Sequence, residues 1–556
     1  MKQFAKLIAS GVLLASVSSC SSFLDVNNNP NSPLSATPNT ILAQALSVTA
    51  SNYTGGGTNY NSYGSWTAGY WAKSGTVNGY GTERTYTYTS NFYQGLWGNT
   101  YNNLEDYQII QNGAAGYGRH AAIARIMKVY NFLLLVDEYG DIPYFNALKG
   151  LDASLTPKYD SAPAIYRDFL TQLDGAIADI NKAVADPAQI AVSSEDIVFQ
   201  GNMTNWKRFA NTLKLRILMR ASQSNNPTEL PLSLVQSELA KLGSATTTPD
   251  GFITADVVAQ PGYLQTSGKQ NPFFDRYGVV PAGNSFTAEY SYQLPTSFIL
   301  EQYVNNRDPR VAQLYANAPT LQSDGVTPRP ASDWDYSYNY FGTTITGNLR
   351  PYIGADLGYS NPWAGNRASR FRNGGGLLKG FNMPTPLMLM SEYYFLRAEA
   401  ETRGLLTGGD AAAKTDFLSG IQASFTYFYR PATAAATSVT SGVTEYNTYI
   451  SNNSTNPLVN YDLATSNGTL GKQAVIMYQK YLAMNTVGSI EAWDDYRRTG
   501  LPKFRVSTET SLTSRPDKLP TRLLYPQSEV STNAANIPAV TNTSKIFWDV
   551  VDSTNP

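Results

Sequence analysis

The sequence of 556 residues contains one cysteine and one histidine, Cys20 and His120. A single histidine cannot build a His-based metal cluster, and it excludes the HExxH pattern of zinc proteases. A Ser–His–Asp or Cys–His catalytic site would have to use His120, which opens an amphipathic helix pattern and is expected to be structural or exposed. With one cysteine the chain forms no internal disulfide, so a large apolar core must hold the fold together.

Charged residues are also scarce. They make up 15% of the chain, and the formal net charge is −1, so the sequence lacks the basic surface that nucleic-acid-binding proteins use. The glycine triplets at 55–57 and 374–376 lack the Lys-Ser/Thr pair of a phosphate-binding loop. Beyond the first twenty residues, no apolar run is long enough to span a membrane. We therefore expect no nucleic-acid partner, no nucleotide site and no transmembrane domain.

The chain begins with the pattern of a secretory signal peptide, residues 1–19. A basic start precedes an apolar run at 7–17, and small residues lead up to Cys20. Cysteine at this position resembles the lipobox of bacterial lipoproteins, in which the thiol carries diacylglycerol. The alternative is an ordinary leader with a cysteine nearby by chance. We expect Cys20 to be lipidated and residues 20–37, rich in Ser, Asn and Pro, to form a flexible tether.

Apolar residues at helical spacing predict helices in adjacent pairs, at 94–111 and 120–139, 162–183 and 205–222, and 386–404 and 411–429, with another helix at 472–485. Thr385 and Pro386 are expected to begin the fifth of these helices, as cap and first-turn proline. In the helix at 205–222, Lys207, Lys214 and Arg220 are expected to face solvent. Helix pairs of this length resemble tetratricopeptide hairpins, although no clean repeat of about 34 residues is present.

The middle of the chain has a different composition. Residues from about 251 to 380 are rich in Gly, Pro, Asn and aromatics without sustained periodicity, which indicates structured loops and short strands. We predict a mostly α-helical protein with one domain, residues 38–556, into which this loop-rich part is inserted.

Paired carboxylates could still support glycoside hydrolysis, because that chemistry needs no histidine. The candidates are Asp494 and Asp495, or Asp137, Glu138 and Asp141. Arg497 and Arg498 follow the first pair closely, which favours an ion-paired structural role for Asp494 and Asp495.

Calcium is a minor alternative. Asp333, Asp335, Ser337 and Asn339 alternate like the start of a calcium-binding loop, but Tyr338 replaces the usual glycine and Thr344 the closing glutamate. The pattern is therefore not that of an EF-hand, and we expect no cofactor.

Five longer segments occur along the chain in a characteristic order and at a characteristic spacing. They are SCSSFLDVNNNPN at 19–31, KVYNFLLLVDEYGDIPYFNAL at 128–148, LMLMSEYYFLRAEAETRGL at 387–405, EAWDDYRRTGLP at 491–502 and RLLYPQSEVSTNAAN at 522–536. Each motif alone is loose, but their order behind a lipobox is specific. Together they resemble the SusD/RagB family, the surface nutrient-binding lipoproteins of Bacteroidota.

The resemblance implies a helical fold built on tetratricopeptide-like pairs, with the loop-rich part forming the ligand face. It also implies a partner, a SusC-type TonB-dependent transporter of the outer membrane, on which such a lipoprotein sits as a lid. Cargo would be captured and passed inward with no bond made or broken, so no enzymatic activity is expected. In the last motif, Arg522 and Glu529 are expected to pair and fix the C-terminal tail.

Aromatic residues are abundant, with 38 tyrosines and 8 tryptophans. A sugar site needs exposed rings beside amide and charged side chains on loops, although for any single tyrosine a place in the packed interior is the better interpretation. Residues 65–88 and 334–363 combine these residue types. The candidates for ligand contact are Trp66, Trp71, Tyr80, Tyr86, Trp334, Tyr336, Tyr340 and Trp363, of which we favour Trp71 and Trp334.

The sequence leaves three other interpretations open. The same architecture could carry peptides instead of oligosaccharides. A surface glycosidase could use the paired carboxylates. A tetratricopeptide-like scaffold could bind only protein partners.

Overall fold

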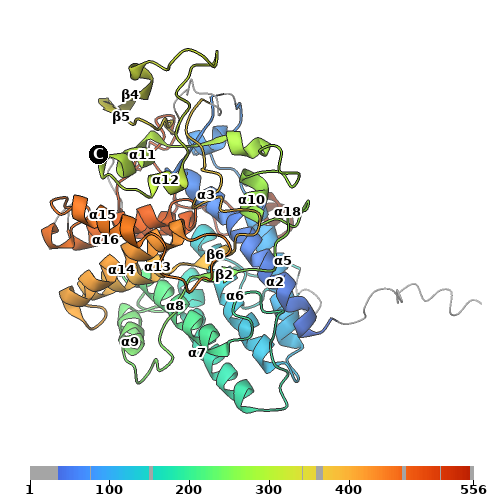
Figure 1. Cartoon of the computed structure of the whole chain (residues 1–556). Helices are drawn as coiled ribbons and strands as arrows, with labels where there is room; N and C mark the ends of the chain where they lie inside the picture. Colours follow the sequence, from blue (N-terminus) through green and yellow to red (C-terminus); the bar gives the residue numbers. More distant parts are fainter. Residues whose placement is uncertain are drawn as a thin grey trace, which may run out of the picture.

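The computed structural model describes residues 36–75, 77–149, 155–340, 342–358, 367–465, 471–513 and 515–550. The leader, Cys20 and all but the last two residues of the predicted tether lie outside these ranges. Within them the chain is mostly helical, and its strands are short (Figure 1). This confirms the predicted fold class. None of the helices in these ranges has both the length and the apolar character needed to cross a membrane.

The N-terminal part begins with two helices that the sequence patterns did not indicate, α2 (Pro38–Thr54) and α3 (Tyr60–Thr67). Pro38 opens α2 at its first turn, where a missing N–H is harmless. The side chain of Asn59 caps α3 by accepting a hydrogen bond from the backbone N–H of Ser62, at 2.7 Å. Every residue of α3 is buried, so this helix lacks the two-faced pattern from which helices are recognised.

The first two predicted helix pairs are present, α5 (Gly95–Asn112) with α6 (Gly118–Tyr139) and α7 (Ala162–Ala185) with α8 (Met203–Ala221). A further helix, α9 (Leu232–Leu242), was not predicted. Each of these helices packs against the next along the chain, and Figure 1 shows α6, α7 and α8 side by side. Gly140 ends α6 with φ +74°, a backbone conformation that favours glycine.

The C-terminal helices are α13 (Met390–Thr402), α14 (Gly409–Tyr429), α15 (Val443–Asn452), α16 (Lys472–Met484), α17 (Ser489–Thr499) and α18 (Gln527–Thr532). The expected start of α13 is wrong. Thr385 and Pro386 belong to strand β6 (Thr385–Met388), which pairs antiparallel with β2 (Val257–Ala259). This pairing keeps the backbone extended, and the helix begins only at Met390.

The loop-rich part consists of short elements joined by long connections. They are α10 (Pro272–Tyr277), η1 (Ala288–Ser291), β3 (Gln293–Pro295), α11 (Ser297–Asn305), α12 (Val311–Leu314), η2 (Ala331–Trp334), β4 (Asp335–Tyr340) and β5 (Thr343–Asn348). Strand β3 pairs with β1 (Trp71–Lys73), next to the short helix α4 (Gly81–Thr85). Strands β4 and β5 form a hairpin that projects from the top of the molecule in Figure 1.

Helix α8 carries charged side chains into the core. Lys214 and Arg220 are each 4% exposed, so the expectation that they face solvent is wrong. The reason is that α7, α9, α13 and α17 pack around α8 and leave it little free surface. Lys214 pairs with Asp174 and Glu238, at 2.7 Å each. Its charge is therefore compensated inside the protein.

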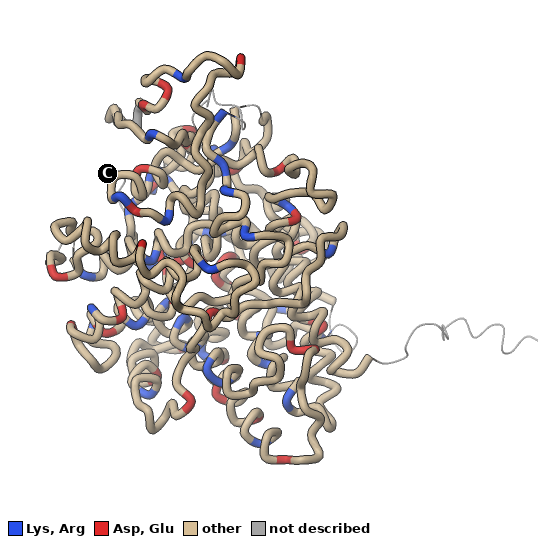
Figure 2. The backbone as a smooth tube through the Cα atoms, viewed as in Figure 1, with Lys and Arg blue, Asp and Glu red and all other residues tan. Residues whose placement is uncertain are grey.

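Arg220 is the centre of a buried set of charges that joins three helices. It pairs with Asp137 on α6 and with Glu491 and Asp494 on α17. We call these four residues the Arg220 network. Burial raises the pKa of Asp137 to about 7, although Arg220 opposes this effect. In the view of Figure 2, acidic and basic residues are spread over the whole outline, at its centre and at its edges.

Two more arginines connect α13 to the same helices. Arg216 of α8 donates to both carboxylate oxygens of Glu392, at 2.7 Å each. Arg498 of α17 donates to both oxygens of Glu399, at 2.6 and 2.7 Å. Such two-point contacts fix the relative orientation of both side chains. Buried ion pairs thus hold together segments that are far apart in the sequence.

Candidate ligand-binding site

Trp71 lies in the core. Its ring is 0% exposed and packs against Tyr277 and Phe371, with ring centroids 5.4 and 5.7 Å away. Its indole N–H donates to the hydroxyl of Thr486, at 3.0 Å. The expectation that this ring is displayed is wrong, because the pairing of β1 with β3 places the residue in the interior.

Tyr86 is also buried, with 1% exposure, and its hydroxyl accepts a hydrogen bond from the backbone N–H of Ser507 at 3.2 Å. Packing therefore holds the ring in place, and the hydrogen bond to the backbone holds the hydroxyl group. Its ring is not displayed either.

Trp66 and Tyr80 form a stacked pair. Their ring centroids are 4.6 Å apart, with 27° between the planes. Tyr80 is half-buried and lies over Trp66, which is 2% exposed. The outer ring of this pair is thus Tyr80, and Trp66 supports it from below.

The hydroxyl of Tyr80 belongs to a polar group near the surface. It accepts from the side-chain amide of Gln293 at 2.7 Å and donates to Glu289 at 3.3 Å. Arg276 pairs with the other oxygen of Glu289 at 3.3 Å, and both side chains keep more than a quarter of their surface exposed. Burial and the nearby Glu289 raise the pKa of Tyr80, so its hydroxyl stays protonated at neutral pH. We call Trp66, Tyr80, Arg276, Glu289 and Gln293 the Tyr80 cluster.

An exposed ring lies on the same loop as Glu289. Phe286 is 45% exposed and stacks on Tyr290, with centroids 3.9 Å apart and 8° between the planes. The guanidinium of Arg370 lies 4.7 Å from the centre of the Tyr290 ring. The structure therefore places an accessible aromatic face three residues before an acidic side chain, which is the combination that a sugar site needs.

The sequence analysis missed Phe286, Glu289 and Arg276. Phe286 follows Gly283, Asn284 and Ser285 in a stretch without periodicity. An aromatic residue directly after a loop stretch of Gly, Asn and Ser is the signal that could have pointed to Phe286. The two charged residues have no sequence pattern that links them to Tyr80.

The second predicted stretch lies around the hairpin. Trp334 is 4% exposed, and the guanidinium groups of Arg329 and Arg350 lie 5.7 and 5.8 Å from its ring centre. It packs with a small apolar cluster separate from the main core, made of Ala72, Leu294, Ala318, Ile353, Ala355 and Ala368. Trp334 thus anchors the hairpin, and its ring is not displayed as expected.

Tyr336 belongs to strand β4 of the hairpin and is half-buried. It lies opposite Gly347 in the β4–β5 register, and a Cβ atom at Gly347 would lie 2.4 Å from the Tyr336 hydroxyl. Only glycine leaves room for the ring there. Tyr340 ends β4 opposite Thr343. Trp363 lies outside the described residues.

Charged groups surround Tyr336. Arg505 pairs with Glu301 at 2.5 Å. Burial raises the pKa of Glu301 to about 7, against the effect of Arg505. Burial and the neighbouring Glu301 raise the pKa of Asp356 to about 7 as well. The pKa values of both carboxyl groups are thus raised toward neutral pH, and Glu301 is 5% exposed.

The carboxylates proposed for hydrolysis occupy structural positions. Asp137, Glu138 and Asp494 are each at most 1% exposed. Glu138 pairs with Arg497 at 2.6 Å, and the other two belong to the Arg220 network. These groups cannot reach a substrate at the surface, so the structure gives no support to a glycosidase built on them.

The remaining two candidate carboxylates are also occupied. Asp495 pairs with Lys480 at 2.6 Å and with Arg498 at 3.0 Å, as the adjacent arginines in the sequence indicated. Asp141 accepts a hydrogen bond from the backbone N–H of Ala162 at 2.8 Å, at the start of α7.

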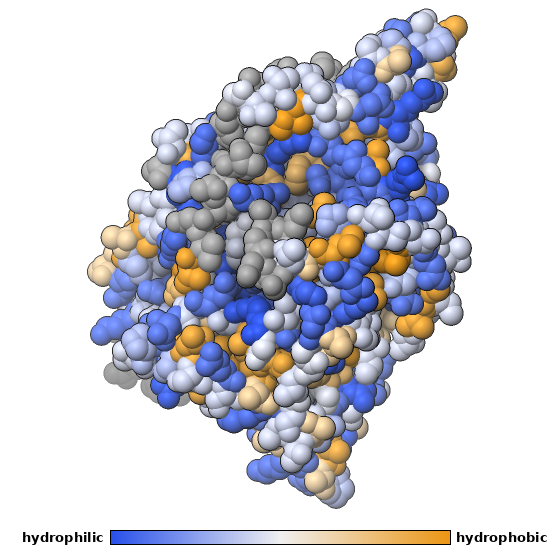
Figure 3. All heavy atoms as spheres, turned by 90° about the vertical axis from the view of Figure 1, so that its left-hand side faces the viewer, coloured by the Kyte–Doolittle hydropathy of each residue, from blue (hydrophilic) through white to orange (hydrophobic). Residues whose placement is uncertain are grey.

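Apolar residues do not form one large exposed patch on the face shown in Figure 3. They occur in small groups separated by hydrophilic residues. A surface of this kind suits ligands that present both apolar faces and hydroxyl groups.

Comparisons with known proteins agree with this architecture. The model of a family described as starch-binding and associating with the outer membrane, SusD-like, matches residues 30–526. A SusD homologue from Bacteroides fragilis is 22% identical, with a TM-score of 0.67, 90% of this chain and 94% of that chain covered. A chitin-binding SusD homologue from Flavobacterium johnsoniae is 21% identical, with a TM-score of 0.67 and coverages of 92% and 99%. No curated protein matches the sequence. The chain belongs to the SusD-like family.

Proposed function

We propose that this protein is a cell-surface lipoprotein that captures an oligosaccharide and delivers it to a SusC-type TonB-dependent transporter of the outer membrane. The observation that carries the proposal is the exposed Phe286 ring, which stacks on Tyr290, the residue that follows Glu289 of the Tyr80 cluster in the chain. Membership of a family described by starch binding at the outer membrane supports it, as does the likeness to a chitin-binding homologue.

The geometry suits reversible binding in which no covalent bond of the ligand is made or broken. The apolar C–H face of a sugar ring stacks on Phe286, and its hydroxyl groups exchange hydrogen bonds with Glu289 and Arg276, which remain partly exposed. Each contact is modest, so the affinity for one oligosaccharide is expected to lie at about 10 µM to 1 mM. Weak binding allows the ligand to be passed on to the transporter.

Replacing Phe286 with alanine is expected to weaken glycan binding at least about tenfold, or about 1.4 kcal/mol. The ring is already 45% exposed, so the melting temperature should change little. Affinity gel electrophoresis with starch, chitin oligosaccharides and other neutral glycans measures the binding. Leu264→Ala, at another exposed loop position, is the matched control and should keep full retention. If wild type and Phe286→Ala bind a glycan equally well, the proposed binding site is wrong. If the protein binds only peptides, the proposed ligand class is wrong.

Replacing Cys20 with serine is expected to release the protein from membranes while leaving glycan binding intact. Acyl chains on Cys20 contribute about 0.8 kcal/mol per buried CH₂. Among the described residues, no helix has the length and apolar character to cross a membrane. Cell fractionation in a strain without the partner transporter makes the measurement. Retention of the serine variant in the membrane fraction under these conditions would contradict lipid anchoring.

A further inference from the structure

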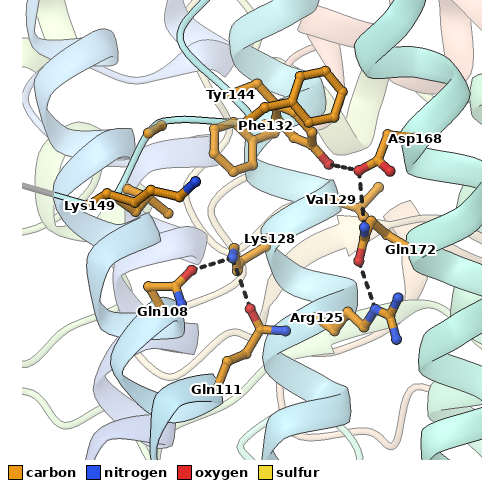
Figure 4. Close-up of a pocket in the computed structure, with 13 residues that line it drawn as sticks. Gln108, Gln111, Arg125, Lys128, Val129, Phe132, Tyr144, Lys149, Asp168 and Gln172 are labelled. Atoms are coloured by element: carbon orange, nitrogen blue, oxygen red, sulfur yellow. Dashed lines mark hydrogen bonds between the residues drawn. The ribbon is translucent and has the colours of Figure 1, made fainter. Parts of the chain in front are cut away.

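A cavity lies between α5, α6 and α7 (Figure 4). Its volume is about 230 Å³. Drug-sized ligand pockets usually enclose roughly 300–1,000 Å³, so this one has room for a small terminal group of a larger molecule. The loop that follows α6 covers one side of it with Tyr144, Phe145 and Lys149.

One wall of the cavity carries a lysine without a carboxylate partner. The ammonium group of Lys128 donates to the side-chain oxygens of Gln108 and Gln111, at 2.6 and 2.8 Å. Among the described residues, no carboxylate lies within 4.0 Å of it. Burial lowers the pKa of Lys128 to about 8 and Arg125 adds to this effect, although the charges of Glu105 and Asp168 oppose it. Lys149 extends toward the same space in Figure 4.

The opposite wall carries Asp168, whose carboxylate can accept hydrogen bonds from hydroxyl groups. The Oδ2 atom of Asp168 accepts from the Tyr144 hydroxyl at 2.7 Å and from the Gln172 amide at 3.0 Å. Gln172 in turn accepts from Arg125 at 2.8 Å, and Arg125 pairs with Asp179 at 2.8 Å. These bonds fix the orientation of Asp168 and occupy one of its oxygens. The other oxygen, Oδ1, has no partner in the part of the chain that the structure describes.

An exposed ring completes the site. Phe145 is 46% exposed and packs edge-on against Tyr144, with ring centroids 4.9 Å apart. The cavity thus combines a lysine that no carboxylate contacts directly, an oriented carboxylate and an accessible aromatic face. A simple anion would use the lysine alone and would be repelled by Asp168. A neutral sugar would use Asp168 and Phe145 but leave Lys128 without a directly paired anion.

We propose that this cavity is a second ligand site that binds an acidic sugar residue, one carrying a carboxylate or a sulfate. The acid group pairs with Lys128, a sugar hydroxyl donates to Oδ1 of Asp168, and the ring packs on Phe145. Charge-assisted hydrogen bonds of this kind are stronger than neutral ones, and burial strengthens them further. The site is separate from the Tyr80 cluster and does not depend on the function proposed for it.

The test is titration calorimetry of the complete mature chain with tri-galacturonate and with a κ-carrageenan tetrasaccharide, which separates carboxylate from sulfate recognition. Maltotriose serves as the neutral probe. Wild type is expected to bind at least one acidic saccharide, more weakly at higher salt. Lys128→Gln should reduce that affinity at least tenfold, whereas Lys128→Arg should keep most of it. Lys182→Gln, which removes the same charge from an exposed position on α7, is the matched control and should have no effect.

Melting temperatures show that each variant is folded. The proposal is overturned if wild type binds neither acidic saccharide, or if Lys128→Gln binds like wild type. Phe286→Ala separates the two sites. If that variant loses the acidic saccharide while Lys128→Gln keeps it, the ligand binds near Phe286 and the cavity proposal fails. If neutral glycans do not bind but an acidic saccharide binds and Lys128→Gln weakens it, the result supports the cavity proposal and contradicts the proposed neutral-glycan site.

Discussion

Replacing Arg220 with methionine is expected to lower the free energy of unfolding by about 3–5 kcal/mol. The change leaves Asp137, Glu491 and Asp494 buried without the cation that all three share. Methionine fills part of the space, so the loss comes mainly from uncompensated charge. Urea denaturation followed by circular dichroism measures the difference. Arg167→Met, on the exposed face of α7, is the matched control and should change stability by less than about 0.5 kcal/mol.

The loss of stability in Arg220→Met is expected to depend on pH in a definite direction. Burial already raises the pKa of Asp137 to about 7 in the folded protein, and removal of Arg220 raises it further. A carboxyl group whose pKa is higher in the folded state stabilises the fold at low pH, and this contribution disappears as the pH rises through the folded pKa. The deficit of Arg220→Met should therefore be smaller at pH 5.5 than at pH 8. A deficit that is equal at both values would show that lost packing, not charge, is the cause.

Replacing Trp71 with alanine is expected to destabilise the protein by about 3–5 kcal/mol, because it empties the space between Tyr277 and Phe371. It also removes the hydrogen bond from the indole to Thr486. The measurement is again the urea midpoint, with Phe286→Ala as a control in which a large ring is lost from the surface. Any loss of glycan binding in Trp71→Ala then reports a damaged fold. An unchanged midpoint together with lost binding would instead show that Trp71 contacts the ligand in another conformation.

The fold class could be predicted because helices with one apolar face have a clear period. The face of α7 illustrates this, since Ile165, Phe169 and Leu173 are all fully buried. The same reasoning failed where a helix is covered on several sides. Helix α3 has no polar face to detect, and α8 buries Lys214 and Arg220 because their partners come from α7, α9 and α17. Sequence periodicity carries no information about partners that distant helices supply.

The ends of elements were predicted where local chemistry decides them. Gly140 ends α6 as expected. Pro386 was misplaced because a proline before an apolar run fits a first helical turn as well as a short strand, and the pairing with β2 decides between them. The expected pair of Arg522 and Glu529 does not form. Arg522 donates to the backbone oxygen of Tyr139, and Glu529 accepts from Tyr159 at 2.8 Å.

The ligand-contacting residues were the least predictable part. Aromatic residues beside amides and charges were found at 65–88, but the sequence does not say which rings face outward. Tyr80 remains near the surface while Trp66 beneath it is covered. The cavity residues Lys128 and Asp168 lie on different helices, and only the packing of α6 against α7 brings them to one space. The contacting roles of Tyr80, Tyr336, Tyr340 and Trp363 stay predictions.

The buried ion pairs also bear on the order in which the chain can fold. Arg497 and Glu138 are 359 positions apart. Arg220 of α8 pairs with Asp137 of α6, but two further carboxylates come to it from α17, and the cation that pairs with Glu138 of α6 also lies on α17. Before α17 joins, α6 would have to bury Glu138 without this counter-charge, which is unfavourable. We therefore expect stable packing of α6 and α8 to require α17, which lies near the C-terminal end of the chain.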